Sequence, residues 1–362
     1  MRIGFHSPMP PARTGVADYS AALAGALRAA GHDVRIGGEG DVELQHIGNN
    51  ALHRGIYERA LARPGAVILH DAVLQHFYLG FGDETRYVEE FVHNYGEWHR
   101  GTAHALWRNR ARSGADPQYF GFPMLRRVAD AARLVIVHNP GAAAMVRTHS
   151  PGARVAELPH LFTAPPTPPT WHDALALRQE WGLPAGTLLF GVFGYLRESK
   201  RLHTVLAAAR RAGAWLLVAG EFVSEDYARA MEPLLREEPR VIRVARHLSE
   251  DAFWNHAQAV DACINLRYPT AGETSGIAIR LMGLGKPVLL TGGPEASAFP
   301  DDTCLRIDAG TAEEEMLALS MAALMQAPGA ARQMGLQAQE YIQRMHAPAR
   351  VAAQLTELLA RP

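Results

Sequence analysis

The stretch PTAGETSGIAIRLMGLGKPVLL, residues Pro269–Leu290, joins a polar loop to a short apolar helix and a buried strand. Ile277, Leu281 and Leu284 recur at helical spacing, which predicts a helix with one face on a sheet. Gly285 is expected to end that helix, and a Val- and Leu-rich strand follows. Such alternation of helix and strand is typical of parallel α/β sheets.

The same alternation extends along the whole chain. Short runs rich in Val, Ile and Leu are each followed by a longer stretch with helical spacing. Nine strands suit two sheets better than one. The runs predicted to be strands are Arg2–Phe5, Val34–Ile36, Ala66–Leu69, Leu134–Val137, Leu188–Phe193, Trp215–Val218, Ile242–Ala245, Ala262–Leu266 and Pro287–Leu290.

A proline-rich segment divides the chain. LPHLFTAPPTPPTWHD, residues 158–173, carries five prolines between Pro159 and Pro169, which exclude regular helix and central strand. We therefore expect an N-terminal Rossmann-like domain over 1–163, a C-terminal one over 164–345, and a helix over 346–362 that returns to the first domain. A ligand in such a protein is expected at the carboxyl ends of the strands.

Composition excludes several classes of protein. The 362 residues contain 36 basic and 37 acidic side chains, a net charge of −1, which does not favour nucleic acid as a partner. Two cysteines without metal-ligand spacing fit a reducing cytoplasm. The N-terminus lacks the apolar region of a signal peptide, and no apolar run approaches the roughly 18 residues of a membrane span. Membrane contact would therefore be peripheral.

The polar loop before the apolar helix points to an anion site. Ser275 and Gly276 occupy its first turn, where backbone N–H groups lack helical partners and the macrodipole is positive. The alternative is that Thr274 or Ser275 only caps the helix. Capping does not account for the acid at Glu273.

This segment resembles the donor-binding motif of the family-4 glycosyltransferases, which are retaining enzymes of the GT-B fold. The resemblance implies that Glu273 contacts hydroxyls of the transferred sugar, and that Thr274, Ser275 and Gly276 face the nucleotide diphosphate. The family's second Glu, which binds the ribose, is replaced by Leu281 in this GETSG variant. Arg280 is expected either near the nucleotide or in a surface ion pair.

A second motif, FGYLRESKRL, residues 193–202, follows the first strand of the C-terminal half. It is similar to the family's Gly-Arg-Leu-x-x-x-Lys pattern, with Gly194 at the turn, Lys200 six residues later and Tyr195 in place of the arginine. Cations suit this position because the charge of the leaving diphosphate grows in the transition state. We expect Lys200, with Arg197 or Arg201, to stabilise it. The alternative is a solvated pair of cations on a helical turn.

The N-terminal half carries two further parts of the resemblance. The loop with Arg13, Thr14 and Gly15 is similar to the family loop in which a glycine lets backbone approach the donor phosphates or the acceptor. His70 ends a predicted strand and matches a family histidine beside the reacting centre. The alternative for His70 is a histidine with purely structural hydrogen bonds.

The segment QHIGNN, residues 45–50, gives Asn49 and Asn50 as candidates for an acceptor pocket, or for a loop held by its own asparagines. Twelve of the 17 histidines lie in the first 160 residues, but their spacing matches no metal motif. We expect no metal and no cofactor beyond the donor substrate, as the resemblance also implies.

Residues Tyr95–Arg133 mix tryptophans with seven arginines. This composition suits either contact with anionic lipid at the inner face of the membrane, or an ordinary acceptor-side segment with salt bridges.

Together, the ordered motifs and the family resemblance that they carry imply a cytoplasmic hexosyltransferase. It would move a hexose from a nucleotide sugar to a hydroxyl of a glycan, lipid-linked or small-molecule acceptor, with retention, for example in polysaccharide biosynthesis. Two alternatives stay open: another GT-B enzyme, such as a nucleotide-sugar epimerase, and a catalytically silent sugar-nucleotide-binding subunit.

Overall fold

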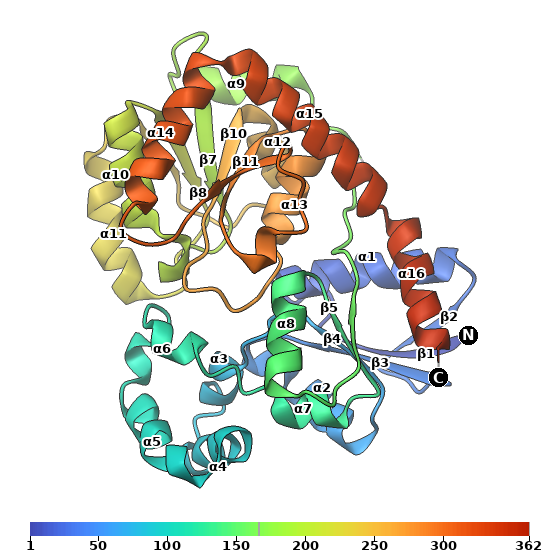
Figure 1. Cartoon of the computed structure of the whole chain (residues 1–362). Helices are drawn as coiled ribbons and strands as arrows, with labels where there is room; N and C mark the ends of the chain where they lie inside the picture. The colour runs from blue at the N-terminus through green and yellow to red at the C-terminus, as the bar shows by residue number, and fades with distance from the viewer. Residues whose placement is uncertain (166, 362) are drawn as a thin grey trace. The chain divides into compact units, whose positions relative to one another are not determined.

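The computed structural model describes residues 1–165 and 167–361. Its contacts divide the chain into two compact units (Figure 1). Unit 1 comprises residues 1–161, 269–274 and 345–362, and unit 2 comprises residues 162–268 and 275–344. No helix in the described part of the chain is long and apolar enough to cross a membrane.

Unit 1 is built on a parallel six-stranded sheet in the order β2-β1-β3-β4-β5-β6. Its strands are β1 (Arg2–His6), β2 (Asp33–Ile36), β3 (Val42–Ile47), β4 (Ala66–Leu69), β5 (Leu134–Val137) and β6 (Val155–Glu157). Its helices are α1 (Gly15–Ala29), α2 (Arg54–Ala62), α3 (Gln75–Leu79), α4 (Glu84–Tyr95), α5 (Arg100–Arg108), α6 (Pro117–Phe120), α7 (Arg126–Ala131), α8 (Pro140–His149) and α16 (Pro348–Ala360).

Unit 2 has a second parallel six-stranded sheet, in the order β12-β11-β10-β7-β8-β9. Its strands are β7 (Leu189–Phe193), β8 (Trp215–Ala219), β9 (Val241–Val244), β10 (Ala262–Asn265), β11 (Val288–Thr291) and β12 (Cys304–Ile307). Its helices are α9 (Trp171–Glu180), α10 (Leu202–Ala212), α11 (Glu225–Glu237), α12 (Glu250–Ala259), α13 (Gly276–Gly283), α14 (Glu313–Gln326) and α15 (Pro328–Met345).

Each sheet has one point at which the strand order reverses. In unit 1 this switch point lies between β1 and β3, and in unit 2 it lies between β7 and β10. Loops that leave the carboxyl ends of two such strands separate to opposite faces and create a natural ligand site. Apolar cores cover both sheets.

The final helix returns to unit 1, as expected. α15 ends at Met345 and a new helix, α16, begins at Pro348 and packs along α1 (Figure 1). Val351, Ala352 and Leu355 of α16 are fully buried in the same cluster as Leu23 of α1. Burial of the Val351 and Leu355 side chains contributes about 1.5–3 kcal/mol each.

The structure adds β3, β6 and β12 to the nine expected strands. β3 lacks an apolar run because it carries Glu43, Gln45 and His46, all of them buried. Glu43 accepts hydrogen bonds from Arg59, and Gln45 donates to a backbone carbonyl of Arg63. These partners make the buried polar strand stable.

Candidate functional site

In unit 2, the two sequence motifs meet at the switch point of the sheet. Gly194 follows β7 with a φ of +83°, which only glycine adopts readily. A Cβ atom at Gly194 would lie 3.7 Å from the Ile277 side chain and 4.0 Å from Lys200 Nζ. The turn after β7, the lysine and the first turn of α13 are therefore immediate neighbours.

Lys200 is held beneath this turn. It ends a short 3-10 helix, Glu198–Lys200, its side chain is 5% exposed, and Nζ donates to the carbonyl of Phe193 at 2.6 Å. Burying an ammonium group is costly unless it is hydrogen-bonded. The carbonyl therefore fixes the lysine at the carboxyl end of β7.

The N-terminus of α13 gathers polar groups around one hydroxyl. Ser275 Oγ caps the helix by accepting from the backbone N–H of Ala278 at 3.3 Å. Asn265 Nδ2 donates to the same oxygen at 2.6 Å, and Arg267 Nη2 lies 3.4 Å from it. The first turn of α13 thus carries both its own N–H groups and a guanidinium, a combination that suits a phosphate.

Arg267 was not among the expected site residues. It lies two residues beyond β10, on the other strand of the switch point, and its backbone N–H donates to Thr291 Oγ1 at 2.8 Å. Only its position in the sequence points to Arg267 as a site residue, because the residues after β10 lead directly into the GETSG loop.

The other predicted cations of unit 2 lie as follows. Arg197 is exposed at the start of the 3-10 helix. Arg201 pairs with the buried carboxylate of Glu313, with Nη2 and Oε2 2.7 Å apart. Arg280 pairs with Glu250 at 2.6 Å, so the structure shows the ion pair that was one of its two interpretations.

In unit 1, five histidines stand at the carboxyl ends of successive strands. His6 ends β1, His46 lies near the end of β3, and His70 and His138 directly follow β4 and β5. His160 lies three residues beyond β6. The rings of the last four surround Tyr19, with centroid distances of 4.8–6.0 Å.

Backbone carbonyls and neighbouring rings hold these histidines in place. His138 Nδ1 donates to the carbonyl of Leu158 at 2.9 Å, and His53 Nδ1 donates to that of His46 at 2.9 Å. His46 Nδ1 and His70 Nε2 are 3.1 Å apart.

His46, His70 and His138 stay uncharged at neutral pH. Burial, and next the proximity of His46, holds the pKa of His70 well below its ordinary value. Burial likewise lowers the pKa of His46 well below that value, and it lowers the pKa of His138 to about 4. Neutral imidazoles can exchange hydrogen bonds with hydroxyl groups. This edge of unit 1 therefore suits an uncharged polyol.

The loop that carries Glu273 belongs to unit 1. Residues 269–274 pack on the ends of β4 and β5, where the backbone N–H of Ala72 donates to the Ala271 carbonyl at 2.7 Å. Glu273 Oε2 accepts from the backbone N–H of Ala271 at 2.8 Å, which orients the carboxylate. Asn139, which follows β5, donates to both neighbours of Glu273, Gly272 and Thr274. Asn139 belongs to none of the sequence motifs.

The remaining candidates of unit 1 have local roles. Thr14 caps α1 through the backbone N–H of Ala17, Gly15 begins the helix with open space at its Cα, and Arg13 is exposed. Asn49 Oδ1 accepts from the backbone N–H of Phe77, and Asn50 Oδ1 from that of Leu52. The loop is thus held by its own asparagines, the second interpretation offered for it.

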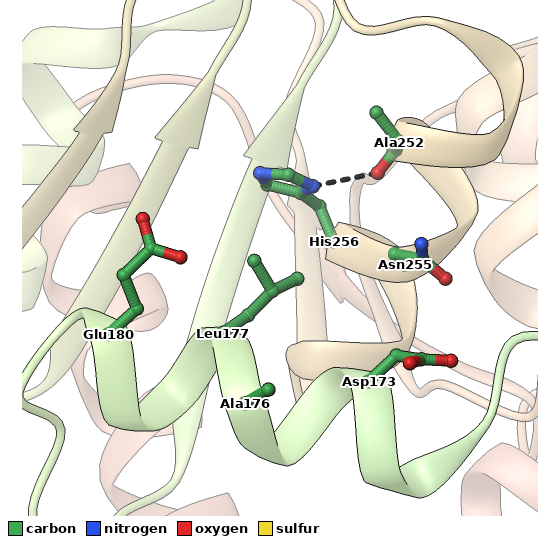
Figure 2. A pocket seen from close by; sticks show the side chains of 7 residues that line it. All are labelled: Asp173, Ala176, Leu177, Glu180, Ala252, Asn255 and His256. Carbon is green, nitrogen blue, oxygen red and sulfur yellow. Dashed lines mark hydrogen bonds between the residues drawn. The ribbon is translucent and has the colours of Figure 1, made fainter.

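One pocket of unit 2 lies apart from these residues. Figure 2 shows it between α9 and α12, with a hydrogen bond from His256 Nδ1 to the Ala252 carbonyl. Its lining, which includes Asp173, Leu177 and Glu180, contains none of the expected site residues. Within residues 1–165 and 167–361, no group of three or more His, Cys, Asp or Glu side chains could hold a metal ion.

Comparison with known proteins adds the fold family. No protein-family model matches the chain, and no curated protein matches it in sequence. Among solved structures, sucrose-phosphate synthase from Thermosynechococcus elongatus matches with a TM-score of 0.70 and 18% identity, over 99% of this chain and 98% of that one.

Two further structures match over nearly their full length. HepE from Anabaena, in complex with UDP and glucose, has a TM-score of 0.65 and 15% identity over 99% of both chains. The catalytic domain of starch synthase IV from Arabidopsis thaliana, bound to ADP and acarbose, has a TM-score of 0.64 and 12% identity, over 99% of this chain and 98% of that one. The chain thus has the GT-B fold of glycosyltransferases.

Proposed function

We propose that the chain is a glycosyltransferase that moves a hexose from a nucleotide-diphosphate sugar to a hydroxyl acceptor, with retention of configuration and without a catalytic metal. The observation that carries this proposal is the meeting of Lys200 Nζ, the Gly194 turn and the first turn of α13. The GT-B fold, shared with structures that hold UDP or ADP, supports it.

The chemistry of the leaving group fits these residues of unit 2. As the glycosidic bond breaks, negative charge builds up on the diphosphate, and groups already oriented toward that charge stabilise the transition state. At an effective dielectric constant near 20, one cation about 4 Å from the charge contributes about 4 kcal/mol. We assign this role to Lys200 and to the amides of Ser275 and Gly276, with Arg267 as an added cation.

The residues of unit 1 suit the sugar. The carboxylate of Glu273 can accept hydrogen bonds from hexose hydroxyls, and the neutral ring of His70 can donate one. In the proposed retaining route, the bond between the anomeric carbon and the diphosphate oxygen breaks, the acceptor hydroxyl bonds to that carbon on the same face of the sugar, and the leaving phosphate takes up the proton of the hydroxyl. The acceptor would be a glycan, a lipid-linked sugar or a small molecule, as in polysaccharide biosynthesis.

Peripheral membrane contact is a separate part of the proposal, for a cytoplasmic enzyme with a lipid-linked acceptor. In the segment expected to touch lipid, Trp98 is 99% exposed, whereas Trp107 is buried and lies under Arg110. Cosedimentation with vesicles that contain anionic lipid tests this contact. Equal cosedimentation of the Trp98→Ala variant would exclude Trp98 as the point of contact.

The experiment for the main function is a thermal-shift panel of UDP, GDP, ADP and dTDP sugars, followed by product analysis for each sugar that binds. A donor at 100 times its Kd stabilises the folded state by about 2.7 kcal/mol. Slow hydrolysis, or transfer to an acceptor, supports a transferase. Epimerised donor without acceptor would identify an epimerase, binding without turnover would identify a silent subunit, and no shift with any sugar would contradict the proposal.

A further inference from the structure

The loop 269–274 is fitted closely to unit 1. Gly272 adopts a φ of +73°, and a Cβ atom there would lie 2.7 Å from the Cβ of Ala72. Ala72 also donates its backbone N–H to Ala271. Within the loop, Thr270 Oγ1 accepts from the backbone N–H of Gly272 at 3.0 Å. The backbone on the N-terminal side of Glu273 is thereby fixed.

The amide of Asn139 contacts both residues that flank Glu273. Asn139 is 2% exposed, and its Nδ2 donates to the Gly272 carbonyl and to Thr274 Oγ1, each at 2.9 Å. Both amide hydrogens are therefore used on the loop. Its Oδ1 accepts from the backbone N–H of Ala142 at 2.7 Å and caps α8.

Helix capping accounts for the oxygen of the Asn139 side chain but not for its NH2 group. An N-cap needs an acceptor oxygen, which Ser or Asp supplies as well as Asn does. Only an amide places a second, donating group opposite that oxygen. The amide group of Asn139 donates to Gly272 and Thr274, the residues on either side of Glu273. Glu273 is the acid assigned to the sugar.

We infer that Asn139 is the positioning residue for Glu273: it caps α8 with its oxygen, and with its amide hydrogens it holds the backbone carbonyl of Gly272 and the hydroxyl of Thr274, the two residues that flank Glu273. This inference rests on the proposed function for its catalytic consequence. The fixing of the loop does not depend on that function. Asn139 itself is assigned no contact with substrate.

A second asparagine has the corresponding place in unit 2. Asn265 ends β10, is 3% exposed, and donates to Ser275 Oγ. Thr274 and Ser275 are consecutive in sequence, and each is bound by a buried asparagine at a strand end of its own unit. The polypeptide is thus anchored on both sides of the peptide bond at which it passes from unit 1 to unit 2.

Hydrogen exchange of the loop tests the positioning directly. In Asn139→Ser, the hydroxyl can still cap α8 but is too short to reach Gly272 and Thr274. We expect the peptide covering residues 269–276 to exchange about tenfold faster than in the wild type. The matched control is Asp83→Ser, which replaces the N-cap of α4 in the same unit and leaves the loop untouched. Unchanged loop exchange in Asn139→Ser would overturn the inference.

Thr274→Val tests the same contact independently, in case Asn139→Ser fails to fold. It removes one acceptor of the amide without altering Asn139, and we expect faster exchange confined to the same peptide. Exchange that accelerates throughout unit 1 in both variants, and not at the loop in particular, would show a general role in stability and would overturn the positioning role.

Kinetics test the catalytic consequence. With the donor found by the ligand panel, Asn139→Ser should lower kcat about tenfold or more, with KM within about threefold. In a Glu273→Gln background, the same substitution should lower kcat less than twofold, because its effect passes through Glu273. Equal losses in both backgrounds would overturn the inference. If no donor is turned over, the proposed function fails, and the exchange experiment still decides whether Asn139 fixes the loop.

Discussion

His46 Nδ1 lies 3.1 Å from His70 Nε2, and the two rings are stacked at an angle of 22°. One of the two nitrogens must carry the proton. His46 Nε2 is buried and has no hydrogen-bond partner among the described residues. Orphaned buried N–H groups are rarer than orphaned acceptors, so the proton of His46 belongs on Nδ1, where it is donated to His70. His70 then keeps its own proton on Nδ1.

We therefore predict that His70 is the Nδ1–H tautomer at pH 7.5. Long-range proton–nitrogen correlation spectra of the histidine rings would show this, with His70 assigned by comparison with His70→Gln. In His46→Leu the donor is lost, and we expect the Nε2–H form of His70 to appear. A wild-type His70 protonated on Nε2 would contradict the assignment.

Acid should lower the stability of unit 1 over a defined pH range. Burial lowers the pKa of His138 to about 4 and that of His346 to about 4, whereas an unfolded histidine titrates near 6.5. Between those two values the unfolded state binds more protons than the folded state, so stability falls as pH falls. Each histidine then costs on the order of 3 kcal/mol by pH 4, and little more below it.

Hydrogen exchange of the unit 1 strands between pH 7 and pH 4, corrected for intrinsic rates, measures this loss. The His138→Gln variant should show a shallower dependence on pH, because one titrating group has been removed. A slope equal to that of the wild type would show that His138 does not contribute.

Replacing Lys200 should impair turnover far more than folding. Lys200→Met keeps the apolar stem but removes the charge beside the Gly194 turn. Loss of one group that stabilises developing charge lowers kcat/KM by about 10²–10³. Steady-state kinetics with the identified donor would check this, alongside a thermal midpoint to confirm folding. Unchanged kcat/KM would exclude the assigned role.

The sequence predicts the elements whose pattern is apolar and regular. The nine Val-, Ile- and Leu-rich runs are all strands in the structure, and Pro348 separates two helices as expected. β3 was missed because buried Glu43 and Gln45 interrupt its apolar pattern. Their partners, Arg59 and the carbonyl of Arg63, come from a different element, α2, and its C-terminus, so a local pattern cannot reveal them.

The candidate site likewise contains residues that the sequence predicts and residues that it does not. Lys200, Gly194 and Ser275 form recognisable motifs, and the structure brings them together. Asn139 and Arg267 belong to no motif, since their relevance comes from contacts across long sequence separations, such as Asn139 with Thr274. A rule that inspects the residues just after each strand of a parallel sheet would have selected both.

Arg267 should contribute to the affinity for nucleoside diphosphates. Its guanidinium lies at the N-terminus of α13, beside Ser275 Oγ, where a phosphate would be bound. We expect Arg267→Gln to weaken diphosphate binding about tenfold and to reduce its dependence on salt, as measured by calorimetry at two ionic strengths. Arg236→Gln, which removes an exposed charge from α11, is the control. Equal effects of the two substitutions would indicate only a general loss of charge.

Gly272 and Gly82 provide a matched pair for the loop that carries Glu273. Both adopt left-handed backbone, with φ of +73° and +67°, but a Cβ atom at Gly272 would lie 2.7 Å from Ala72, whereas one at Gly82 meets nothing within 4 Å. Substitution by alanine costs about 1–2 kcal/mol at either position from the backbone alone. Only Gly272→Ala adds a clash, which would cost about 1–3 kcal/mol more if the loop kept its position.

The loop can relieve that clash by separating from the end of β4. We therefore expect Gly272→Ala, and not Gly82→Ala, to accelerate hydrogen exchange of residues 269–276 and to lower donor turnover at least tenfold. The two variants should otherwise unfold at similar temperatures, because the clash is relieved locally. Equal loop exchange in both would mean that close packing against Ala72 does not hold the loop, and that the hydrogen bonds of Asn139 and Ala72 suffice.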